Sequence, residues 1–430
     1  MAQSRTSRPP AKPPQRKQGR CLGIGGKGDG VIAFDDGARA HAPYTAPDDL
    51  GMFDIVDDRA TVVELLAEGP DRIQPPCVHY GVCGGCQLQH LTPAFQRNWK
   101  RDRVIEALSR VDLASIIVAD AVETPTAARR RAIFTVDKSR RRTVVGFNER
   151  RSSRIAEVAG CLVMRPDLRD ALPDVRRLAN AVPTGAFDLA ATACRNGIDV
   201  DIRSRKLRRP DAQQYDALFE AAVASPFIRV SLNGEPMLTR SAPAVEFGSA
   251  VVSPPPGAFL QASLEGETAI SKLALGPLAG AKRVADLYAG CGTFALRLAC
   301  EGAEVAAFDI AGPSIDALER AAREARAAGV IRRPLRTEAR DLDERPLHPD
   351  ELSGFEAVVI DPPRAGALGQ MERLARSSVR TVASVSCNPA TFARDARALV
   401  EGGFSIETVT PIDQFVHSAH LEVVGVFQRR

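Results

Sequence analysis

The cysteine in the run Ser386-Cys387-Asn388-Pro389 is well placed for covalent chemistry. It follows the apolar stretch 381–385, which predicts a β-strand, so its thiol would stand at the carboxyl end of that strand. Ligands bind at that edge of an open α/β sheet, and a thiolate there can act as a nucleophile. An isolated cysteine is more often a small buried apolar residue, but the polar, rigid pair Asn388-Pro389 indicates a shaped loop. We therefore predict that Cys387 is a catalytic nucleophile.

A second strand end carries a glycine-rich loop. The predicted strand 284–288 runs into Ala289-Gly290-Cys291-Gly292-Thr293-Phe294, where glycines let the backbone approach a ligand closely. The next predicted strand, 304–308, ends in Asp309, at about the distance where an acid binds a ribose hydroxyl. Since Gly290-x-Gly292-x-x-Ala295 also fits a dinucleotide fingerprint, the loop alone leaves NAD, another nucleoside cofactor or a turn without ligand open.

A third strand end narrows this choice. The apolar stretch 355–360 ends in Asp361-Pro362-Pro363-Arg364. An Asp-Pro-Pro turn at this place is typical of methyltransferases that act on planar bases, because rigid prolines hold the backbone beside the ring. Enzymes that methylate amino groups usually have an aromatic residue next, and the arginine here weakens that reading. An NAD-dependent oxidoreductase would explain the glycine loop but neither this motif nor the one around Cys387.

A thiol close to a methyl donor suits methylation of a ring carbon. Carbon 5 of uracil is too weakly nucleophilic to attack a sulfonium methyl group, so a thiolate first adds to carbon 6 and creates an enolate. After methyl transfer a base must remove the proton from carbon 5, which lets the thiolate leave. We assign this step to Glu422, in His420-Leu421-Glu422; the alternative is a solvated strand residue.

Three further thiols lie close together in Cys77-x5-Cys83-Gly84-Gly85-Cys86, and Cys161 is an available fourth. Nine cysteines in a reducing compartment are not expected to form a disulfide framework. Three near thiolates with one distant thiolate fit an iron–sulfur cluster. A structural zinc site that uses His79 or His90 stays open.

Four parts of the chain must position these groups. A basic arm with little apolar content is predicted to be disordered, and short β-favouring runs then fit a small β-barrel of the oligonucleotide-binding type. The cysteine segment, an amphipathic helix over 92–112 and further strands follow, and apolar strands that alternate with helices then predict a doubly wound, Rossmann-like α/β sheet. These parts are 1–19, 20–72, 73–256 and 257–430, respectively.

The net charge of +4 is modest, but it is unevenly distributed. Arginine and lysine residues gather in four basic clusters. Basic clusters neutralise phosphates, and together these four predict an RNA or DNA partner, although each could also solvate an exposed turn. No apolar run of about 18 residues and no signal-peptide core is present, so we expect a cytoplasmic protein without a membrane partner or an obligate protein partner. The basic clusters are 1–20, Arg129-Arg130-Arg131, Arg140-Arg141-Arg142 and 203–209.

Together these motifs resemble the RNA uracil-5-methyltransferase family, and in particular its iron–sulfur branch, which modifies 23S ribosomal RNA in bacteria. The Cys-x5-Cys-Gly-Gly-Cys and Ser-Cys-Asn-Pro runs carry this resemblance, which covers nearly the whole chain. It implies that the barrel is a TRAM domain and that helix 92–112 packs on the catalytic domain. It also implies a 4Fe-4S cluster whose ligands are Cys77, Cys83, Cys86 and Cys161.

The resemblance also implies roles for single residues. Cys387 falls on the nucleophile and Glu422 on the base, and the implied contacts to S-adenosylmethionine are Gln261 of Phe259-Leu260-Gln261, Tyr288, Gly290, Thr293, Asp309, Asp341 and Asp361. Four positions depart from the usual pattern without removing a required group. Asp309 stands in place of glutamate, Ala289 in place of a common cysteine, and Thr293 and Asp341 in place of common asparagines.

The resemblance favours ribosomal RNA as substrate, because relatives that methylate transfer RNA often lack both the barrel and the cluster. A tRNA uracil-5-methyltransferase is therefore the alternative. A non-enzymatic RNA-binding assembly factor would have lost Cys387, Glu422 or the glycine loop, and all three are present.

Overall fold

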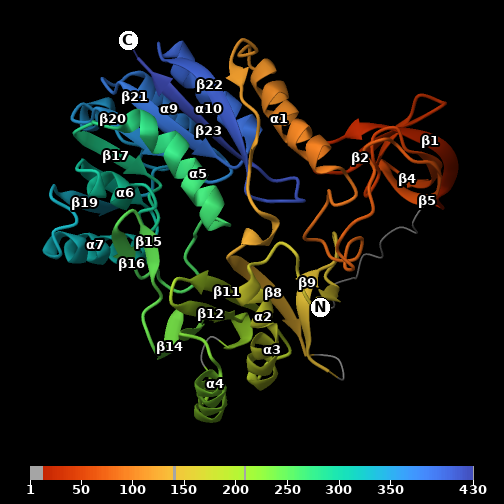
Figure 1. Ribbon diagram of the computed structural model, residues 1–430, viewed down its shortest axis with the longest axis horizontal. Helices are drawn as coiled ribbons and strands as arrows, with labels where there is room; N and C mark the ends of the chain where they lie inside the picture. The colour runs from red at the N-terminus through yellow and green to blue at the C-terminus, as the bar shows by residue number, and fades with distance from the viewer. Residues whose placement is uncertain (1–12, 139–141, 208–209, 430) are drawn as a thin grey trace, which may run out of the picture. The chain divides into compact units, whose positions relative to one another are not determined.

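The computed structural model describes residues 13–138, 142–207 and 210–429 (Figure 1). By its internal contacts the chain divides into two compact units. One unit contains Met1–Gly81, Cys86–Trp99 and His417–Ala419. The other contains Val82–Gly85, Lys100–Val416 and His420–Arg430. Most of the predicted N-terminal arm, residues 1–12, lies outside the described residues.

The first unit contains a closed five-stranded barrel, which confirms the predicted barrel. Its core is formed by small, aliphatic and aromatic side chains that include Cys21, Ile32 and Phe53. The strand order is β1-β2-β3-β5-β4, with β1 (Gln15–Ile24), β2 (Gly30–Phe34), β3 (Arg39–Ala42), β4 (Leu50–Val56) and β5 (Arg59–Ala67).

The predicted start of the barrel at residue 20 is wrong by five residues. The polar stretch Gln15–Gly19 belongs to β1 and pairs with β4, where Arg16 also binds Asp54 at 2.8 Å. Backbone pairing holds this stretch in the sheet, so its low apolar content does not leave it disordered.

Helix α1 (Pro93–Ser109) follows the cysteine-rich segment. The hydroxyl of Thr92 accepts a hydrogen bond from the backbone N–H of Phe95 (3.2 Å), as an N-cap residue does. The helix ends three residues before the predicted limit at 112. Its buried side chains Val104 and Leu108 belong to the same hydrophobic cluster as residues of the C-terminal sheet.

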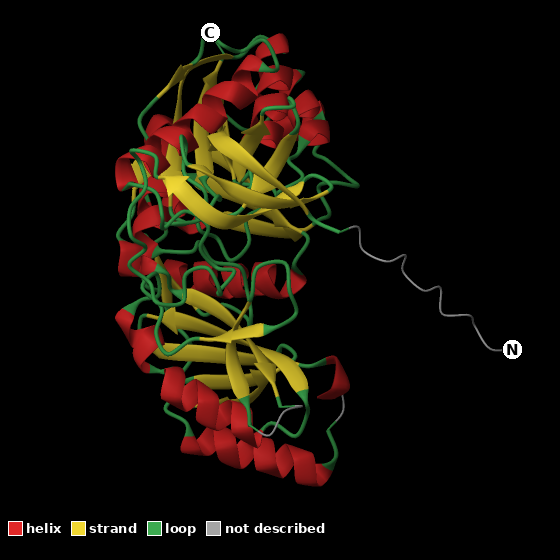
Figure 2. Ribbon diagram, turned by 90° about the vertical axis from the view of Figure 1, so that its right-hand side faces the viewer, coloured by secondary structure: helices red, strands yellow, loops and turns green. Residues whose placement is uncertain are grey.

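A seven-stranded sheet occupies the middle of the chain, in the order β10-β9-β8-β11-β12-β13-β14. Helices α2 (Pro166–Asp170), α3 (Leu172–Ala181) and α4 (Ala212–Ala224) pack with it around one core (Figures 1 and 2). The strands are β8 (Arg131–Asp137), β9 (Val144–Asn148), β10 (Ile155–Glu157), β11 (Ala186–Cys194), β12 (Gly197–Arg203), β13 (Arg229–Leu232) and β14 (Glu235–Thr239).

The C-terminal part is the predicted doubly wound α/β sheet, in the order β19-β18-β17-β20-β21-β23-β22-β6, with β7 also paired to β22. Its strands are β6 (Ile117–Val118), β7 (Val122–Glu123), β17 (Arg283–Leu287), β18 (Glu304–Asp309), β19 (Leu335–Ala339), β20 (Ala357–Ile360), β21 (Thr381–Ser386), β22 (Ser405–Asp413) and β23 (Glu422–Gln428). The order reverses between β17 and β20, which makes the crevice beyond their carboxyl ends a ligand-binding position.

Two hydrophobic clusters lie on the two faces of this sheet. Side chains of one strand alternate between them: Val359 belongs to the first cluster, and Val358 and Ile360 belong to the second. The first contains residues of α5 (Leu264–Leu275), α6 (Ala295–Cys300) and α7 (Gly312–Ala327). The second contains residues of α1, α8 (Pro349–Leu352), α9 (Leu368–Ala375) and α10 (Pro389–Glu401).

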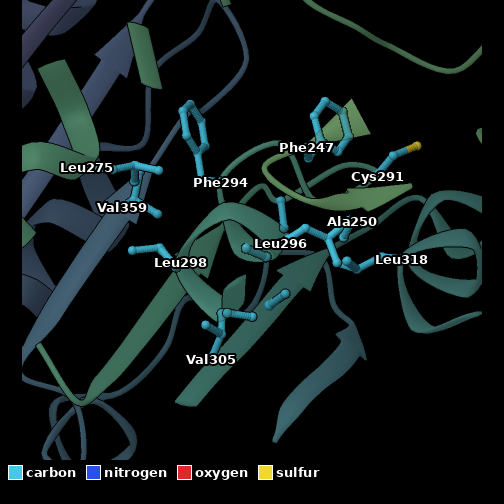
Figure 3. Packing of buried hydrophobic residues seen from close by; sticks show 14 of the residues in the cluster. Phe247, Ala250, Leu275, Cys291, Phe294, Leu296, Leu298, Val305, Leu318 and Val359 are labelled. Carbon is cyan, nitrogen blue, oxygen red and sulfur yellow. The ribbon is translucent and has the colours of Figure 1, made fainter. Parts of the chain in front are cut away.

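The hairpin of β15 (Val245–Phe247) and β16 (Ala250–Val252) packs with the first of these clusters, although it precedes the predicted domain boundary at 256. Figure 3 shows Phe247 and Ala250 among Leu296 and Leu318 of this cluster. The Pro254-Pro255-Pro256 run is therefore a connection inside the folded part and not its edge.

Among the described residues, no helix combines the length and the apolar character needed to cross a membrane.

Candidate active site

Three predicted site residues emerge on the same face of the C-terminal sheet. Side chains two residues apart in a strand point to the same side. Asp361, Cys387 and Glu422 each stand two residues from a member of the first hydrophobic cluster, namely Val359, Val385 and Val424. The carboxyl ends of β20 and β21 and the amino end of β23 therefore present a thiol and two carboxyls toward the side of α5.

The register between β21 and β23 brings the thiol and one carboxyl together. These antiparallel strands pair from Thr381 with Gln428 to Ser386 with Val423. Cys387 directly follows Ser386 of this last pair, and Glu422 directly precedes Val423. The predicted nucleophile and the predicted base therefore both adjoin the last pair of this ladder, close enough for Glu422 to raise the pKa of Cys387.

Burial and like charges raise the pKa values of these groups. Burial first, and then the neighbouring carboxyls of Glu422 and Asp361, raise the pKa of Cys387 to about 11, and Arg364 opposes them. Burial also raises the pKa of Glu422 to about 8, with a contribution from Asp361 and an opposing hydrogen bond from Gln414. For Asp361, burial raises the pKa to about 7 against a hydrogen bond from Gln261. The ligand-free site therefore favours a neutral thiol.

Hydrogen bonds join both carboxyls through two glutamines. The amide nitrogen of Gln261 donates to Asp361 Oδ2 (3.1 Å). The amide nitrogen of Gln414 donates to Gln261 Oε1 (2.7 Å) and to Glu422 Oε1 (3.1 Å). Gln261, Gln414 and Glu422 are each at most 5% exposed. Sequence reasoning missed Gln414, because no motif in the sequence around it marks the residue.

Arg130 holds the segment around Gln261 in place. Its Nε donates to the carbonyl of Gln261 (3.0 Å), and its guanidinium also binds the buried carboxylate of Glu267 on α5. Arg297 binds the other oxygen of Glu267 at 2.8 Å. Arg130 is 4% exposed, so its assignment to an RNA-binding cluster is wrong. A run of arginines looks like a solvated surface when its buried partner lies far away in the sequence.

The other basic clusters are described only in part. Arg131 lies 5.6 Å from the ring centroid of the exposed Phe259, and Arg129 lies 6.0 Å from that of Phe415. Burial, with Arg203, Arg130 and Arg129, lowers the pKa of Arg131 to about 10, as expected where cations gather. Arg140, Arg141, Arg208 and Arg209 lie outside the described residues.

The glycine loop follows β17 with unusual backbone angles. Tyr288, Gly290 and Gly292 have φ values of 62°, 54° and 92°. A Cβ atom on Gly292 would lie 2.4 Å from the side chain of Leu318, whereas one on Gly290 would meet nothing within 4 Å. The fold therefore requires glycine at 292 for packing, and space remains beside Gly290, as a ligand approaching the backbone would need.

Hydrogen bonds join most of the predicted cofactor residues to this loop or to one another. Asp309 accepts hydrogen bonds from the N–H of Gly290 (2.9 Å) and of Ala311 (2.7 Å). The hydroxyl of Tyr288 donates to Asp343 (2.7 Å), and Asp341 accepts from the N–H of Asp343 (3.0 Å). Thr293 is half-buried in the turn before α6, and Gln261 and Asp361 are joined to each other as described above.

Asp286 is a buried carboxyl that sequence reasoning did not assign. It is fully buried in β17, beneath the glycine loop, and its Oδ2 accepts from the N–H of Ala295 (2.8 Å). Its Oδ1 has no hydrogen-bond partner in the part of the chain that the structure describes. Burial raises its pKa well above the ordinary value. An acid in an otherwise apolar strand was the sequence signal.

The four candidate metal ligands belong to different units. Cys77 and Cys86 lie in the unit with the barrel, and Cys83 and Cys161 lie in the other. Over residues 13–138, 142–207 and 210–429, no group of three or more His, Cys, Asp and Glu side chains is arranged to hold a metal ion. The cluster ligands, and the alternative zinc site, therefore stay predictions.

Comparisons with known proteins agree with the reaction predicted for this site. A family model described as tRNA (Uracil-5-)-methyltransferase matches residues 278–430. An "uncharacterized RNA methyltransferase" of Caulobacter vibrioides is 43% identical over 94% of this chain and 98% of its own length. The 23S rRNA (uracil(1939)-C(5))-methyltransferase RlmD of Halomonas elongata is 33% identical over 85% of this chain and 78% of its own length.

A solved structure shares the fold over almost the whole chain. It is the tRNA (uracil-54, C5)-methyltransferase of Pyrococcus abyssi in complex with S-adenosyl-L-homocysteine. Its TM-score is 0.73, it covers 96% of this chain and 99% of its own, and it is 20% identical. The match to the family model and the extent of the two sequence relatives show that this chain belongs to the RNA uracil-5-methyltransferase family, whose members are S-adenosylmethionine-dependent enzymes.

Proposed function

We propose that this enzyme methylates carbon 5 of a specific uridine in RNA through a covalent adduct between Cys387 and carbon 6 of the uracil, and that Glu422 resolves the adduct. The family supports the reaction. The covalent mechanism is supported chiefly by the pairing of β21 and β23, whose last pair, Ser386 with Val423, adjoins Cys387 and Glu422.

The residues of this chain suit each step. The thiolate of Cys387 forms a bond to carbon 6, and the electron pair of the 5,6 double bond moves to an enolate. When bound, S-adenosylmethionine would supply the electrophilic methyl group for carbon 5 and would be left as S-adenosylhomocysteine. The carboxylate of Glu422 then takes the proton from carbon 5, the double bond re-forms, and the Cys387 sulfur leaves as thiolate.

The predicted cofactor residues would hold S-adenosylmethionine around the loop after β17. The space beside Gly290 lies at the crevice where the strand order reverses, which supports this placement. Gln261, Tyr288, Thr293, Asp309, Asp341 and Asp361 would supply the polar contacts. Asp309 and Asp361 each already receive hydrogen bonds that fix their orientation, so they would be preorganised for a ligand.

We propose 23S ribosomal RNA as the substrate class, with transfer RNA as the alternative. The relative from Halomonas elongata is named for 23S rRNA, and the structure from Pyrococcus abyssi is named for tRNA. The five-stranded barrel fits the TRAM-like RNA-binding module that the sequence predicts. Fold alone does not fix a substrate, so an experiment must identify the RNA.

Mapping 5-methyluridine across total RNA tests this function. RNA from a strain that lacks the gene should miss one 5-methyluridine in 23S rRNA, and the wild-type gene should restore it. Cys387→Ala should restore nothing while the purified variant still binds S-adenosylmethionine in calorimetry. A lost site in tRNA would establish the alternative substrate. Restoration by Cys387→Ala would exclude the covalent mechanism.

We also propose a 4Fe-4S cluster bound by Cys77, Cys83, Cys86 and Cys161. Their spacing in the sequence supports this assignment. Anaerobically purified protein should be brown and contain iron, and replacement of Cys161 by serine should remove the iron. A colourless protein that contains zinc would overturn this assignment.

A further inference from the structure

Gln414 occupies a fixed position directly after β22. The preceding Asp413 is held by the buried ammonium group of Lys100, and its carbonyl accepts a hydrogen bond from the hydroxyl of Thr124 (2.8 Å). Strand β22 also pairs with β7 up to Asp413. The backbone that carries Gln414 is therefore anchored from α1 and from the neighbouring strand.

Every polar group of the Gln414 side chain has a partner. Its Oε1 accepts from the N–H of Ala262 (3.2 Å), and its amide nitrogen donates to Gln261 and to Glu422. A flipped amide would set its oxygen against two acceptor oxygens and its NH2 against a backbone N–H. Only one orientation of the amide is therefore favourable, with both N–H groups directed at the site.

Helix α5 leaves room for this side chain. A Cβ atom on Gly266 would lie 2.6 Å from Gln414 Cβ and 2.9 Å from its Oε1. Gly266 does not have a positive φ, so backbone conformation does not require a glycine there. Close approach of Gln414 accounts for it. The packing of α5 thus depends on a residue that serves the active site.

We propose that Gln414 is the positioning residue for Glu422: it occupies one carboxylate oxygen, favours the charged form and leaves the other oxygen to take the proton from carbon 5. This inference deepens the proposed function and rests on the role of Glu422 as the base. Among the described residues, no hydrogen bond is made to Glu422 Oε2. A hydrogen bond donated to a carboxylate stabilises its charged form, which a base buried near Asp361 needs.

Other charged groups around Glu422 are accounted for. Asp361 and Cys387 face it from β20 and β21, with Arg364 acting on Cys387. Glu267 on α5 is paired with Arg130 and Arg297, and Asp413 on β22 is paired with Lys100. His420, just before β23, has its pKa lowered by burial and by surrounding cations. Gln414 is the hydrogen-bond donor that offsets burial at Glu422.

The test measures breakdown of the covalent adduct against pH. Unmethylated RNA from the strain that lacks the gene is mixed with enzyme and S-adenosylmethionine between pH 6 and 9, and the protein–RNA adduct is quantified on denaturing gels. Gln414→Met removes the donor at similar volume. With Gln414→Met, the adduct should accumulate near pH 7 and should no longer accumulate as the pH approaches 9. Each unit of increase in the Glu422 pKa should slow breakdown about tenfold at pH 7.

Three further variants separate the outcomes. Glu422→Gln should accumulate adduct at every pH. If it does not, Glu422 is not the base that removes the proton from carbon 5, and the proposed function is refuted. Gln414→Glu keeps the acceptor for the N–H of Ala262 but replaces the donor to Glu422 by a negative charge. It should therefore slow breakdown of the adduct more than Gln414→Met does. It also tests the inference if the methionine variant does not fold. Gln370→Met is the matched control, since Gln370 is a buried glutamine on α9 bonded to the backbone of Leu347 (2.8 Å). It should behave as wild type.

If Glu422→Gln accumulates adduct while both Gln414 variants break it down at the wild-type rate across the pH range, the inference is wrong and the proposed function stands. A Gln414 defect of equal size at every pH would also overturn it, because a purely structural loss does not follow the protonation of Glu422.

Discussion

The thiol of Cys387 is a poor nucleophile in the ligand-free protein. Burial raises its pKa to about 11, and the carboxyls of Glu422 and Asp361 contribute in the same direction. Only the thiolate adds to carbon 6, so bound substrate must change these surroundings. Low reactivity at rest protects the residue from oxidation, which also acts on the thiolate.

Alkylation by iodoacetamide should reveal this state. In the ligand-free enzyme, the rate of Cys387 modification should rise with pH through about 11, well above the range of an ordinary thiol near 8.5. Glu422→Gln removes a negative neighbour, so it should shift the titration to lower pH. Mass spectrometry of the peptide that contains Cys387 measures the rate. A wild-type midpoint below pH 9 would contradict the prediction.

At the scale of elements, one buried carboxylate ties α5 to the start of β8 and to α6. Glu267 has no exposed surface and binds both Arg130 and Arg297. Removing one partner of a buried ion pair leaves an uncompensated charge, which costs about 3 to 5 kcal/mol. Glu267→Gln should lower the free energy of unfolding by this amount in denaturant titrations.

The exposed pair of Arg195 and Glu246 provides the control for Glu267→Gln. Its side chains are 63% and 51% exposed, and such pairs contribute at most about 1 kcal/mol. Glu246→Gln should therefore change the unfolding free energy little. Equal effects of the two substitutions would show that the ion pairs of Glu267 contribute no more to the free energy of unfolding than an exposed ion pair does.

The predictable part of the site consists of residues at strand ends. Cys387 and Asp361 could be placed because apolar runs mark their strands and short motifs mark the turns that follow. Gln414 and Arg130 could not, because each binds Gln261, which lies more than a hundred residues away, and nothing local distinguishes them. The strand at Gln15–Gly19 was missed for a related reason, since pairing with β4 and not side-chain pattern holds it.

For the whole molecule, the site is a source of pH-dependent stability. Asp361 and Glu422 have pKa values raised to about 7 and about 8 in the folded protein. A carboxyl whose pKa is raised on folding stabilises the protein fully below its unfolded pKa, near 4. This stabilisation is lost as the pH rises through the folded value, by about 1.4 kcal/mol per pH unit for each group.

Comparison of wild type with Glu422→Gln isolates this effect. The variant lacks one carboxyl whose pKa is raised on folding. Its free energy of unfolding, relative to that of wild type, should therefore increase by a few kcal/mol as the pH rises from 5 to 8. Denaturant unfolding of the ligand-free proteins across this range gives the difference directly. A constant difference, or one that decreases with pH, would show that Glu422 does not titrate as the buried site implies.

The pairing of β21 with β23 has an evolutionary consequence. Because the ladder from Thr381–Gln428 to Ser386–Val423 sets where Glu422 stands, insertions in α10 or in the turns between these strands can accumulate without moving the base away from Cys387. A single-residue deletion inside β23 would instead turn the carboxylate to the opposite face of the sheet. Divergent members of the family should therefore vary freely in the length between nucleophile and base, while β23 itself keeps its length.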